Sequence, residues 1–176
     1  TTSVPEGTSI ATTVYTATAT DIAGGTVTYG LSGTDAAAFN INTATGAVTF
    51  KAVPDYEAKT SYSINVTASD GTLTSNQAVT INITDVAPVI SSGTSVSVNE
   101  GIAANTALYT AVAADVAGGT VTYALTGTDA AAFTINSATG VVTINAVPDF
   151  ETKSSYSFNV KASDPSGAFS TQAVTL

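Results

Sequence analysis

Residues 24–57 read "GGTVTYGLSGTDAAAFNINTATGAVTFKAVPDYE", and residues 118–151 read "GGTVTYALTGTDAAAFTINSATGVVTINAVPDFE". Over these 34 positions there are 8 differences, which leaves 26 identities. The same spacing of 94 residues continues outside the two stretches, for example from Glu6 to Glu100. Self-similarity at a fixed spacing is typical of tandem modules. The chain is therefore predicted to contain two copies of one module.

The boundary between the copies is predicted near Val86, in "TDVAPV", because a proline follows a strand-like run there. This gives domains at residues 1–86 and 87–176, each long enough to bury a workable core. The first copy begins just before "VPEG" and the second stops at "QAVTL". We therefore expect the chain to be a piece of a longer tandem array.

Alternating apolar residues indicate β-strands in each module. In "TVTYGL" the apolar side chains Val27, Tyr29 and Leu31 fall on one face. The same alternation gives two more single-faced sets, which are Tyr62, Ile64, Val66 and Ala68, and Val79, Ile81 and Ile83. With Gly, Asp and Asn turns between short segments, each module is predicted to hold about seven strands. The predicted fold is all-β, with two tandem immunoglobulin-like, seven-stranded β-sandwiches joined by a short linker.

The repeated "DAAAF" is the one helical fragment that we expect in each module. Asp35 and Asp129 stand where an N-cap residue stands, and they are predicted to cap a single turn by accepting backbone N–H bonds. These two aspartates are therefore not counted among the candidate metal ligands.

The composition excludes several classes of function. The chain has no Cys, His, Met, Trp or Arg, so thiol nucleophiles, imidazole bases, His/Cys zinc sites and arginine phosphate clamps are absent. The net charge of −9 with only four lysines argues against nucleic acids and anionic membranes as partners and favours metal cations. No apolar run approaches the length of a membrane helix, so we expect no insertion of this segment into a membrane.

Eleven of the thirteen acidic residues lie at predicted strand ends, turns or the linker. Strands that run up and down a sandwich bring such loops together at its two poles. One group of six is predicted to converge where the modules join: Glu6, Asp55 and Glu57 from the first module, Asp85 from the linker, and Asp115 and Asp164 from the second module. A cluster of carboxylates without His or Cys favours a hard cation, and calcium takes about 6 to 8 oxygen ligands.

The order of these motifs resembles the cadherin repeat, in particular the bacterial cadherin-like form of long surface adhesins and polysaccharide-associated proteins. The resemblance covers nearly all of both modules. It rests on "PEG" and "NEG" at the first strand, "PDYE" and "PDFE" in place of Asp-Arg-Glu, "ATD" and "AAD" before Gly-Gly, "ASDG" and "ASDPSG" near the end, and "TDVAP" for the linker.

The resemblance implies an interdomain calcium site built from the six converging carboxylates. It also implies two half-sites that neighbouring repeats would complete, one with Asp21 and Asp70, the other with Glu100, Asp149 and Glu151. Two departures from the family pattern reduce the ligand set. The linker lacks the Asn-Asp-Asn that usually precedes its proline, and Ala23 and Ala117 stand where a second Asp is usual. We therefore expect one or two ions per junction, bound with dissociation constants of roughly 0.1 to 1 mM.

The leading hypothesis for function is a calcium-binding spacer and adhesion module of a bacterial surface or secreted protein, located outside the cell or on its surface. Its expected partners are neighbouring repeats of the same chain and another surface protein. The alternative is a calcium-dependent polysaccharide-binding doublet, with Tyr15, Tyr56, Tyr109 and Phe150 as the candidate surface aromatics. Ice binding by rows of threonine is a weaker alternative, because threonine-rich exposed faces are ordinary in β proteins.

Enzymatic activity is not expected. Paired acids such as Asp55 and Glu57 do serve in glycosidases. Here they stand two residues apart, recur in each module and come with no sign of a cleft. They are interpreted as metal ligands.

Overall fold

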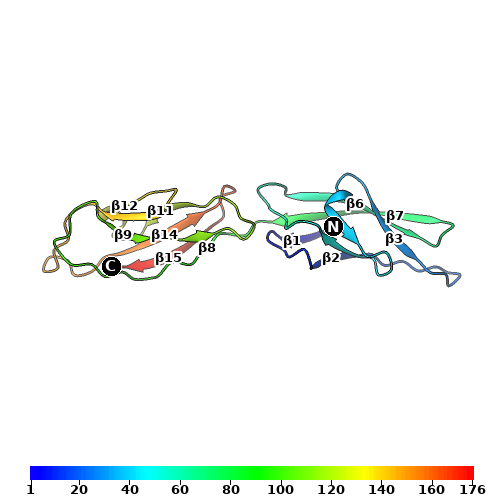
Figure 1. The fold of residues 1–176 in the computed structure, drawn as a ribbon, viewed down its shortest axis with the longest axis horizontal. Coiled ribbons are helices and arrows are strands. Elements are labelled where there is room, and N and C mark those ends of the chain that lie inside the picture. Colours follow the sequence, from blue (N-terminus) through cyan, green and yellow to red (C-terminus); the bar gives the residue numbers. More distant parts are fainter. The chain divides into compact units, whose positions relative to one another are not determined.

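The computed structural model describes the whole chain, Thr1–Leu176, and divides it into unit 1, Thr1–Asp85, and unit 2, Val86–Leu176. Each unit is built of β-strands with one three-residue 3-10 turn (Figure 1). The expectation of an all-β fold is therefore confirmed. Neither turn has the length or the apolar character needed to cross a membrane.

Unit 1 has seven strands in two sheets. The four-stranded sheet has the order β1-β7-β6-β3, and the three-stranded sheet has the order β2-β5-β4. The strands are β1 Thr2–Pro5, β2 Thr13–Thr16, β3 Thr28–Ser32, β4 Phe39–Ile41, β5 Ala47–Phe50, β6 Ser61–Ser69 and β7 Thr74–Thr84. All neighbours pair antiparallel except β1 and β7, which run parallel.

Unit 2 repeats this plan with its first strand divided. Its sheets have the orders β11-β14-β15 and β12-β13-β9, and a short ladder joins β8 to β10. The strands are β8 Val89–Ile90, β9 Ala107–Thr110, β10 Ala113–Ala114, β11 Thr122–Thr126, β12 Phe133–Ile135, β13 Val141–Ile144, β14 Ser157–Ser163 and β15 Phe169–Thr175. In place of the β1–β7 ladder, one parallel bridge joins Ser95 to Thr175.

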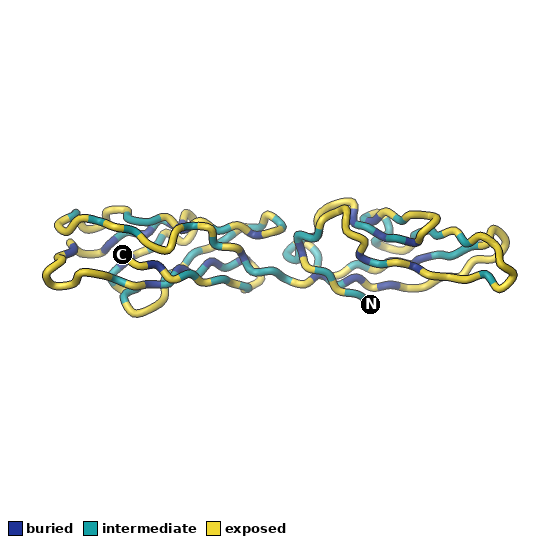
Figure 2. Tube along the Cα trace, turned by 90° about the horizontal axis from the view of Figure 1, so that it is seen from below, coloured by how far each residue is buried: buried dark blue, intermediate teal, exposed yellow.

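The core of each unit follows the predicted alternation, and most of its buried residues lie within the strands. Figure 2 shows buried residues as short segments between more exposed ones along the chain. In unit 1, Ile64 and Val66 of β6 and Val79, Ile81 and Ile83 of β7 are all buried. Strand residues between them point outward, and many of these are Thr, Ser or Asn. Period-two alternation therefore identified the inward faces correctly.

The two helical turns form where they were predicted, at Ala36–Ala38 and Ala130–Ala132, with Asp35 and Asp129 at the N-cap positions. The expected side-chain capping is wrong, because neither aspartate side chain bonds to its turn. Instead, the Lys59 ammonium donates to Asp35 Oδ1 at 2.6 Å.

A second bond fixes the same carboxylate, because the Ser63 N–H donates to Asp35 Oδ2 at 2.7 Å. The turn itself closes through its backbone, with the Ala38 N–H donating to the Asp35 carbonyl at 3.0 Å. The bond from Lys59, followed by the one from Ser63, holds the pKa of Asp35 below its ordinary value. A charged donor bonds a carboxylate more strongly than a neutral amide does, and this explains why the side chain turns away from the helix.

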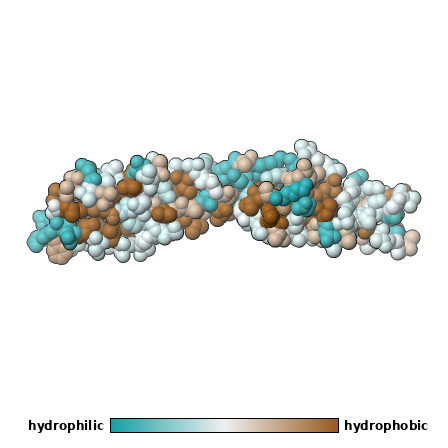
Figure 3. Space-filling view, viewed as in Figure 1, coloured by the Kyte–Doolittle hydropathy of each residue, from teal (hydrophilic) through white to brown (hydrophobic).

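Unit 2 repeats this arrangement with different residue numbers. Lys153 donates to Asp129 Oδ1 at 2.6 Å, and the Ser157 N–H donates to Oδ2 at 2.8 Å. Two of the four lysines, one in each unit, therefore hold a structural aspartate. The face drawn in Figure 3 is mostly pale in hydropathy, with separate apolar patches.

Candidate metal centre

One end of unit 1 is where β7 continues into the linker. The first carboxylate at this end is that of Glu6. It follows β1 directly, and its N–H donates to the Thr84 carbonyl at 3.0 Å, so the parallel pairing of β1 and β7 brings it to the end of β7. The side chain is only 2% exposed. One of its oxygens, Oε2, accepts the Tyr56 N–H at 3.0 Å.

Glu6, Glu57 and Asp85 each contribute a carboxylate oxygen to one cluster, and these oxygens lie within 4.8 Å of one another. Glu57 comes from the turn after β5, and Asp85 is the residue after β7. Two carboxylate charges at that separation repel by roughly 3 kcal/mol at an effective dielectric constant of 20. A divalent cation would turn this repulsion into attraction, so the donor set fits a hard metal ion.

Asp55 is not among the carboxylates that meet in this cluster. Its Oδ1 accepts the Ala58 N–H at 3.0 Å, and the Lys59 N–H donates to its backbone carbonyl at 3.0 Å. In unit 1 this residue therefore shapes the turn that presents Glu57.

Asp115 and Asp164 lie at the end of unit 2 where the linker enters. Asp115 follows β10, whose residue Ala114 pairs with Val89 of β8, and Asp164 follows β14. The two side chains are 7% and 5% exposed, and an oxygen of one lies within 4.8 Å of an oxygen of the other.

Each of these two aspartates uses one oxygen locally. Asp115 Oδ1 accepts the Ala117 N–H at 2.7 Å, and Asp164 Oδ1 accepts the Gly167 N–H and the Ser166 hydroxyl, both at 2.8 Å. The second oxygen of each, Oδ2, is buried and accepts no hydrogen bond. Burying a charged oxygen without a partner is costly, so both carboxylates also fit a cation.

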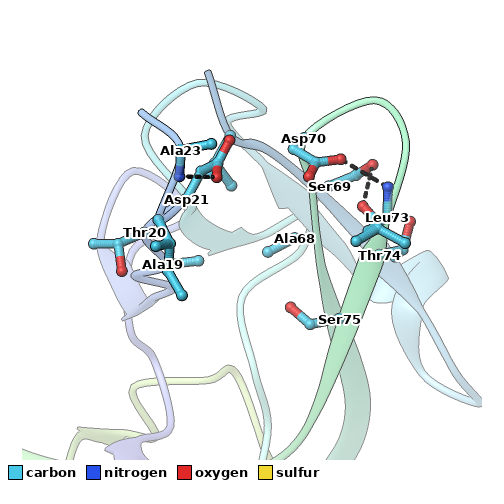
Figure 4. Close-up of a pocket in the computed structure, with 12 residues that line it drawn as sticks. Ala19, Thr20, Asp21, Ala23, Ala68, Ser69, Asp70, Leu73, Thr74 and Ser75 are labelled. Carbon is cyan, nitrogen blue, oxygen red and sulfur yellow. Dashed lines mark hydrogen bonds between the residues drawn. The ribbon is translucent and has the colours of Figure 1, made fainter. Parts of the chain in front are cut away.

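Asp21 and Asp70 occupy the matching positions in unit 1, and they lie on two separate loops that line one pocket (Figure 4). Asp21 accepts the N–H groups of Ala23 at 2.8 Å and Gly25 at 2.9 Å, one on each oxygen. Asp70 Oδ1 accepts two N–H groups at 2.7 Å, and the one from Leu73 contributes most to lowering the pKa of Asp70.

The surface around these two residues is more open than its counterpart in unit 2. There, β8 pairs with β10, and the Ser170 hydroxyl donates to the Pro88 carbonyl. The pocket in unit 1 corresponds to the surface that Pro88 and β8 cover in unit 2.

Glu100, Asp149 and Glu151 form the third acidic group, at the other end of unit 2. Their carboxylate oxygens lie within 4.8 Å of one another, and all three residues are exposed. The Phe150 N–H donates to Glu100 Oε2 at 3.0 Å, which repeats the bond between Tyr56 and Glu6. The Thr152 hydroxyl donates to Asp149 at 2.8 Å, and this bond is the main reason why the pKa of Asp149 is lowered.

The aromatic residues considered at sequence level divide into two kinds. Tyr15, Tyr56 and Tyr109 are half-buried against the cores, whereas Phe150 is 62% exposed. Sequence reasoning missed Phe169, which is 52% exposed and has the Lys161 ammonium 4.0 Å above its ring centroid. Lys161 lies opposite Thr171, and Phe169 lies opposite Ser163, so the two side chains are diagonal neighbours, a relation that the sequence alone does not show.

Comparison with known proteins identifies the family. The model of the cadherin domain matches residues 1–84 and again 94–176. Human Protocadherin Fat 4 is 34% identical over 173 residues, and human Protocadherin Fat 1 is 32% identical over 163 residues. These matches cover 90% and 86% of this chain but only 4% of each relative, so the chain spans a small part of their length.

Among solved structures, human Protocadherin-24 EC1-2 form II matches with a TM-score of 0.51 and 24% identity, over 97% of this chain and 88% of that one. Human CDH23 EC21-23 matches with a TM-score of 0.50 and 24% identity, over 99% of this chain and 65% of that one. These relatives are animal proteins, so they give no support to the expected bacterial origin or polysaccharide partner. Cadherin domains are adhesion modules and not enzymes, so the expectation of no enzymatic activity is confirmed. The chain belongs to the cadherin family and contains two cadherin domains in tandem.

Proposed function

We propose that this chain is an extracellular or cell-surface adhesion module in which calcium binds beside the linker and stiffens the connection between the two domains. The observation that carries the proposal is the group of Glu6, Glu57 and Asp85, whose oxygens lie within 4.8 Å where the chain leaves unit 1. Such a group needs a positive charge, and the family supplies the precedent for calcium between repeats.

The proposed ligands come from both ends of the linker. Glu6, Glu57 and Asp85 would bind from unit 1, and Asp115 and Asp164 would bind from unit 2 through the oxygens that accept no hydrogen bond. Asp55 was expected to join them, and its bond to Ala58 favours a supporting role instead. Calcium fits better than a softer metal because every side-chain donor is a carboxylate oxygen.

The physical consequence concerns flexibility. Without a cation, carboxylates at both ends of a short linker repel one another, and the domains reorient freely. A bound cation links both sets and restricts that motion. The mechanical role of a spacer therefore follows from the charges of these residues, and it requires neither a bacterial parent protein nor a polysaccharide partner.

Solution X-ray scattering of the full chain in calcium and in chelator tests this proposal. We expect calcium to narrow the distribution of interdomain distances that is obtained from the scattering profile. The double variant Glu57→Gln, Asp85→Asn should scatter identically in both conditions, while Asp55→Asn should respond as the original chain does. A scattering profile of the original chain that calcium leaves unchanged would rule out the stiffening role.

A further inference from the structure

Each unit carries two consecutive glycines in one loop, in "DIAGG" after Asp21 and in "DVAGG" after Asp115. The first glycine of each pair is explained by its backbone, because Gly24 and Gly118 have φ values of +82° and +93°, where a residue with a Cβ is strained. The second glycine, at position 25 or 119, has no positive φ. The conformation of the backbone therefore does not account for the second glycine.

The carboxylate of the preceding aspartate accounts for it. In unit 2, a Cβ added to Gly119 would lie 3.0 Å from Asp115 Oδ2 and 3.2 Å from its Cγ. In unit 1, a Cβ added to Gly25 would overlap Asp21 Oδ2, the oxygen that accepts the Gly25 N–H at 2.9 Å. Both loops therefore bring their second glycine closer to a carboxylate than a residue with a side chain readily comes.

Asp115 has little room to move away from such a Cβ. Its side chain is 7% exposed, and its Oδ1 accepts the Ala117 N–H at 2.7 Å. The added Cβ would lie 3.6 Å from Asp115 Cβ, which is an ordinary contact, so the crowding falls on the carboxylate. A methyl group at position 119 would therefore displace mainly Oδ2, because this oxygen accepts no hydrogen bond.

Asp115 Oδ2 is also the atom that the proposed calcium site uses. It is buried without a hydrogen-bond partner, as is Asp164 Oδ2. Ordinary contacts of a Cβ begin at 3.4 Å, so the contact with Oδ2 at 3.0 Å is about 0.4 Å too short. A displacement of that size is larger than the spread of calcium–oxygen distances, which run from about 2.3 to 2.6 Å.

We propose that Gly119 is a positioning residue of the calcium site, because its missing side chain leaves Asp115 Oδ2 in place to bind the cation. Asp115 then divides its two oxygens, with Oδ1 bonded to the loop and Oδ2 available to the metal. The inference rests on the proposed function, since it assigns a further residue to the same site. The role is steric, because Gly119 has no side chain that could be a ligand.

Calcium titration of the full chain and of Gly119→Ala tests this role. We expect Gly119→Ala to weaken calcium binding roughly tenfold, as the loss of a group that orients a metal ligand usually does. Gly118→Ala is the matched control from the same loop, because an added Cβ there meets no atom within 4 Å. It should bind calcium within about twofold of the original chain, although its backbone is strained.

A double-mutant cycle shows whether the effect passes through Asp115. In an Asp115→Asn background, calcium binding is already weaker, and we expect Gly119→Ala to weaken it less than about twofold further. Two residues that act through one contact give non-additive effects. A full tenfold loss in that background would overturn the proposal.

Thermal unfolding separates the positioning role from a structural one. Calcium that binds only the folded chain raises its melting temperature, by an amount that depends on affinity. We expect several millimolar calcium to raise the melting temperature of Gly119→Ala less than that of the original chain and of Gly118→Ala. A structural role would lower the melting temperature equally in calcium and in chelator, and that result would overturn the proposal.

The remaining outcomes distinguish this inference from the proposed function. Full calcium affinity in Gly119→Ala would overturn the positioning role and leave the proposed function standing. Equal weakening in Gly118→Ala and Gly119→Ala would also overturn it, because a general distortion of the loop would then explain the loss. Absence of calcium binding by the original chain would overturn both.

Discussion

Gly140→Ala is expected to lower the free energy of unfolding of unit 2 by about 3 kcal/mol or more. Gly140 has a φ of +71°, a conformation that costs a residue with a Cβ about 1–2 kcal/mol. An added Cβ would also overlap the carbonyl oxygen of Ala111. The backbone there cannot shift freely, because the Ala111 N–H donates to the Gly140 carbonyl at 2.9 Å.

Gly118→Ala is the matched control, since Gly118 has a φ of +93° and no atom within 4 Å of an added Cβ. This control isolates the backbone strain, which should cost only about 1–2 kcal/mol. Chemical denaturation followed by amide exchange in unit 2 would measure both. Equal losses in the two variants would show that the contact with Ala111 contributes nothing.

Phe158→Ala is expected to destabilise unit 2 by about 3–5 kcal/mol, the usual range for removing a buried phenylalanine. Phe158 is 1% exposed and packs against Phe133, with ring centroids 4.7 Å apart, and against Tyr109, at 6.3 Å. Truncation would leave a cavity between the two sheets of the unit. Losses of this size would unfold a marginally stable domain.

Phe169→Ala provides the comparison, because Phe169 lies on the same sheet but is 52% exposed. Its loss should cost about 1 kcal/mol or less, mostly through the contact with Lys161. Calorimetric melting of both variants measures the difference. A loss for Phe158→Ala as small as that for Phe169→Ala would contradict the assignment of Phe158 to the core.

The fold could be predicted because its signals are local and repeated. Period-two alternation depends only on which residues are apolar, so the faces of Tyr62 to Ala68 and of Val79 to Ile83 could be assigned without any knowledge of pairing. The division of the first strand of unit 2 could not be predicted, because it depends on how β8 pairs with β10 in three dimensions.

The site was predictable as a group of residues but not in its internal geometry. The sequence places Asp55 and Glu57 in one loop. Only the structure separates their roles, because the Ala58 N–H donates a hydrogen bond to Asp55. The same limit explains Asp35, because the position of Lys59, 24 residues further on, decides where that side chain points. Bonds between distant segments, such as Tyr56 to Glu6, leave no pattern in a single sequence.

The two repeats of the chain build their acidic groups in the same way. In both units a glutamate after the first strand accepts the N–H of an aromatic residue 50 positions later. This bond fixes one oxygen and leaves the carboxylate beside the next acidic side chains.

Calorimetric titration of calcium into the chelator-stripped full chain tests the central claim most directly. We expect binding with a dissociation constant of roughly 0.1 to 1 mM, weakened at least about tenfold in the variant Glu57→Gln, Asp85→Asn, since each lost ligand charge contributes on the order of 1 kcal/mol. Asp55→Asn, outside the cluster, should change the affinity less than about threefold. Binding that the double variant retains at full strength, or the absence of any heat at several millimolar calcium, would contradict the account.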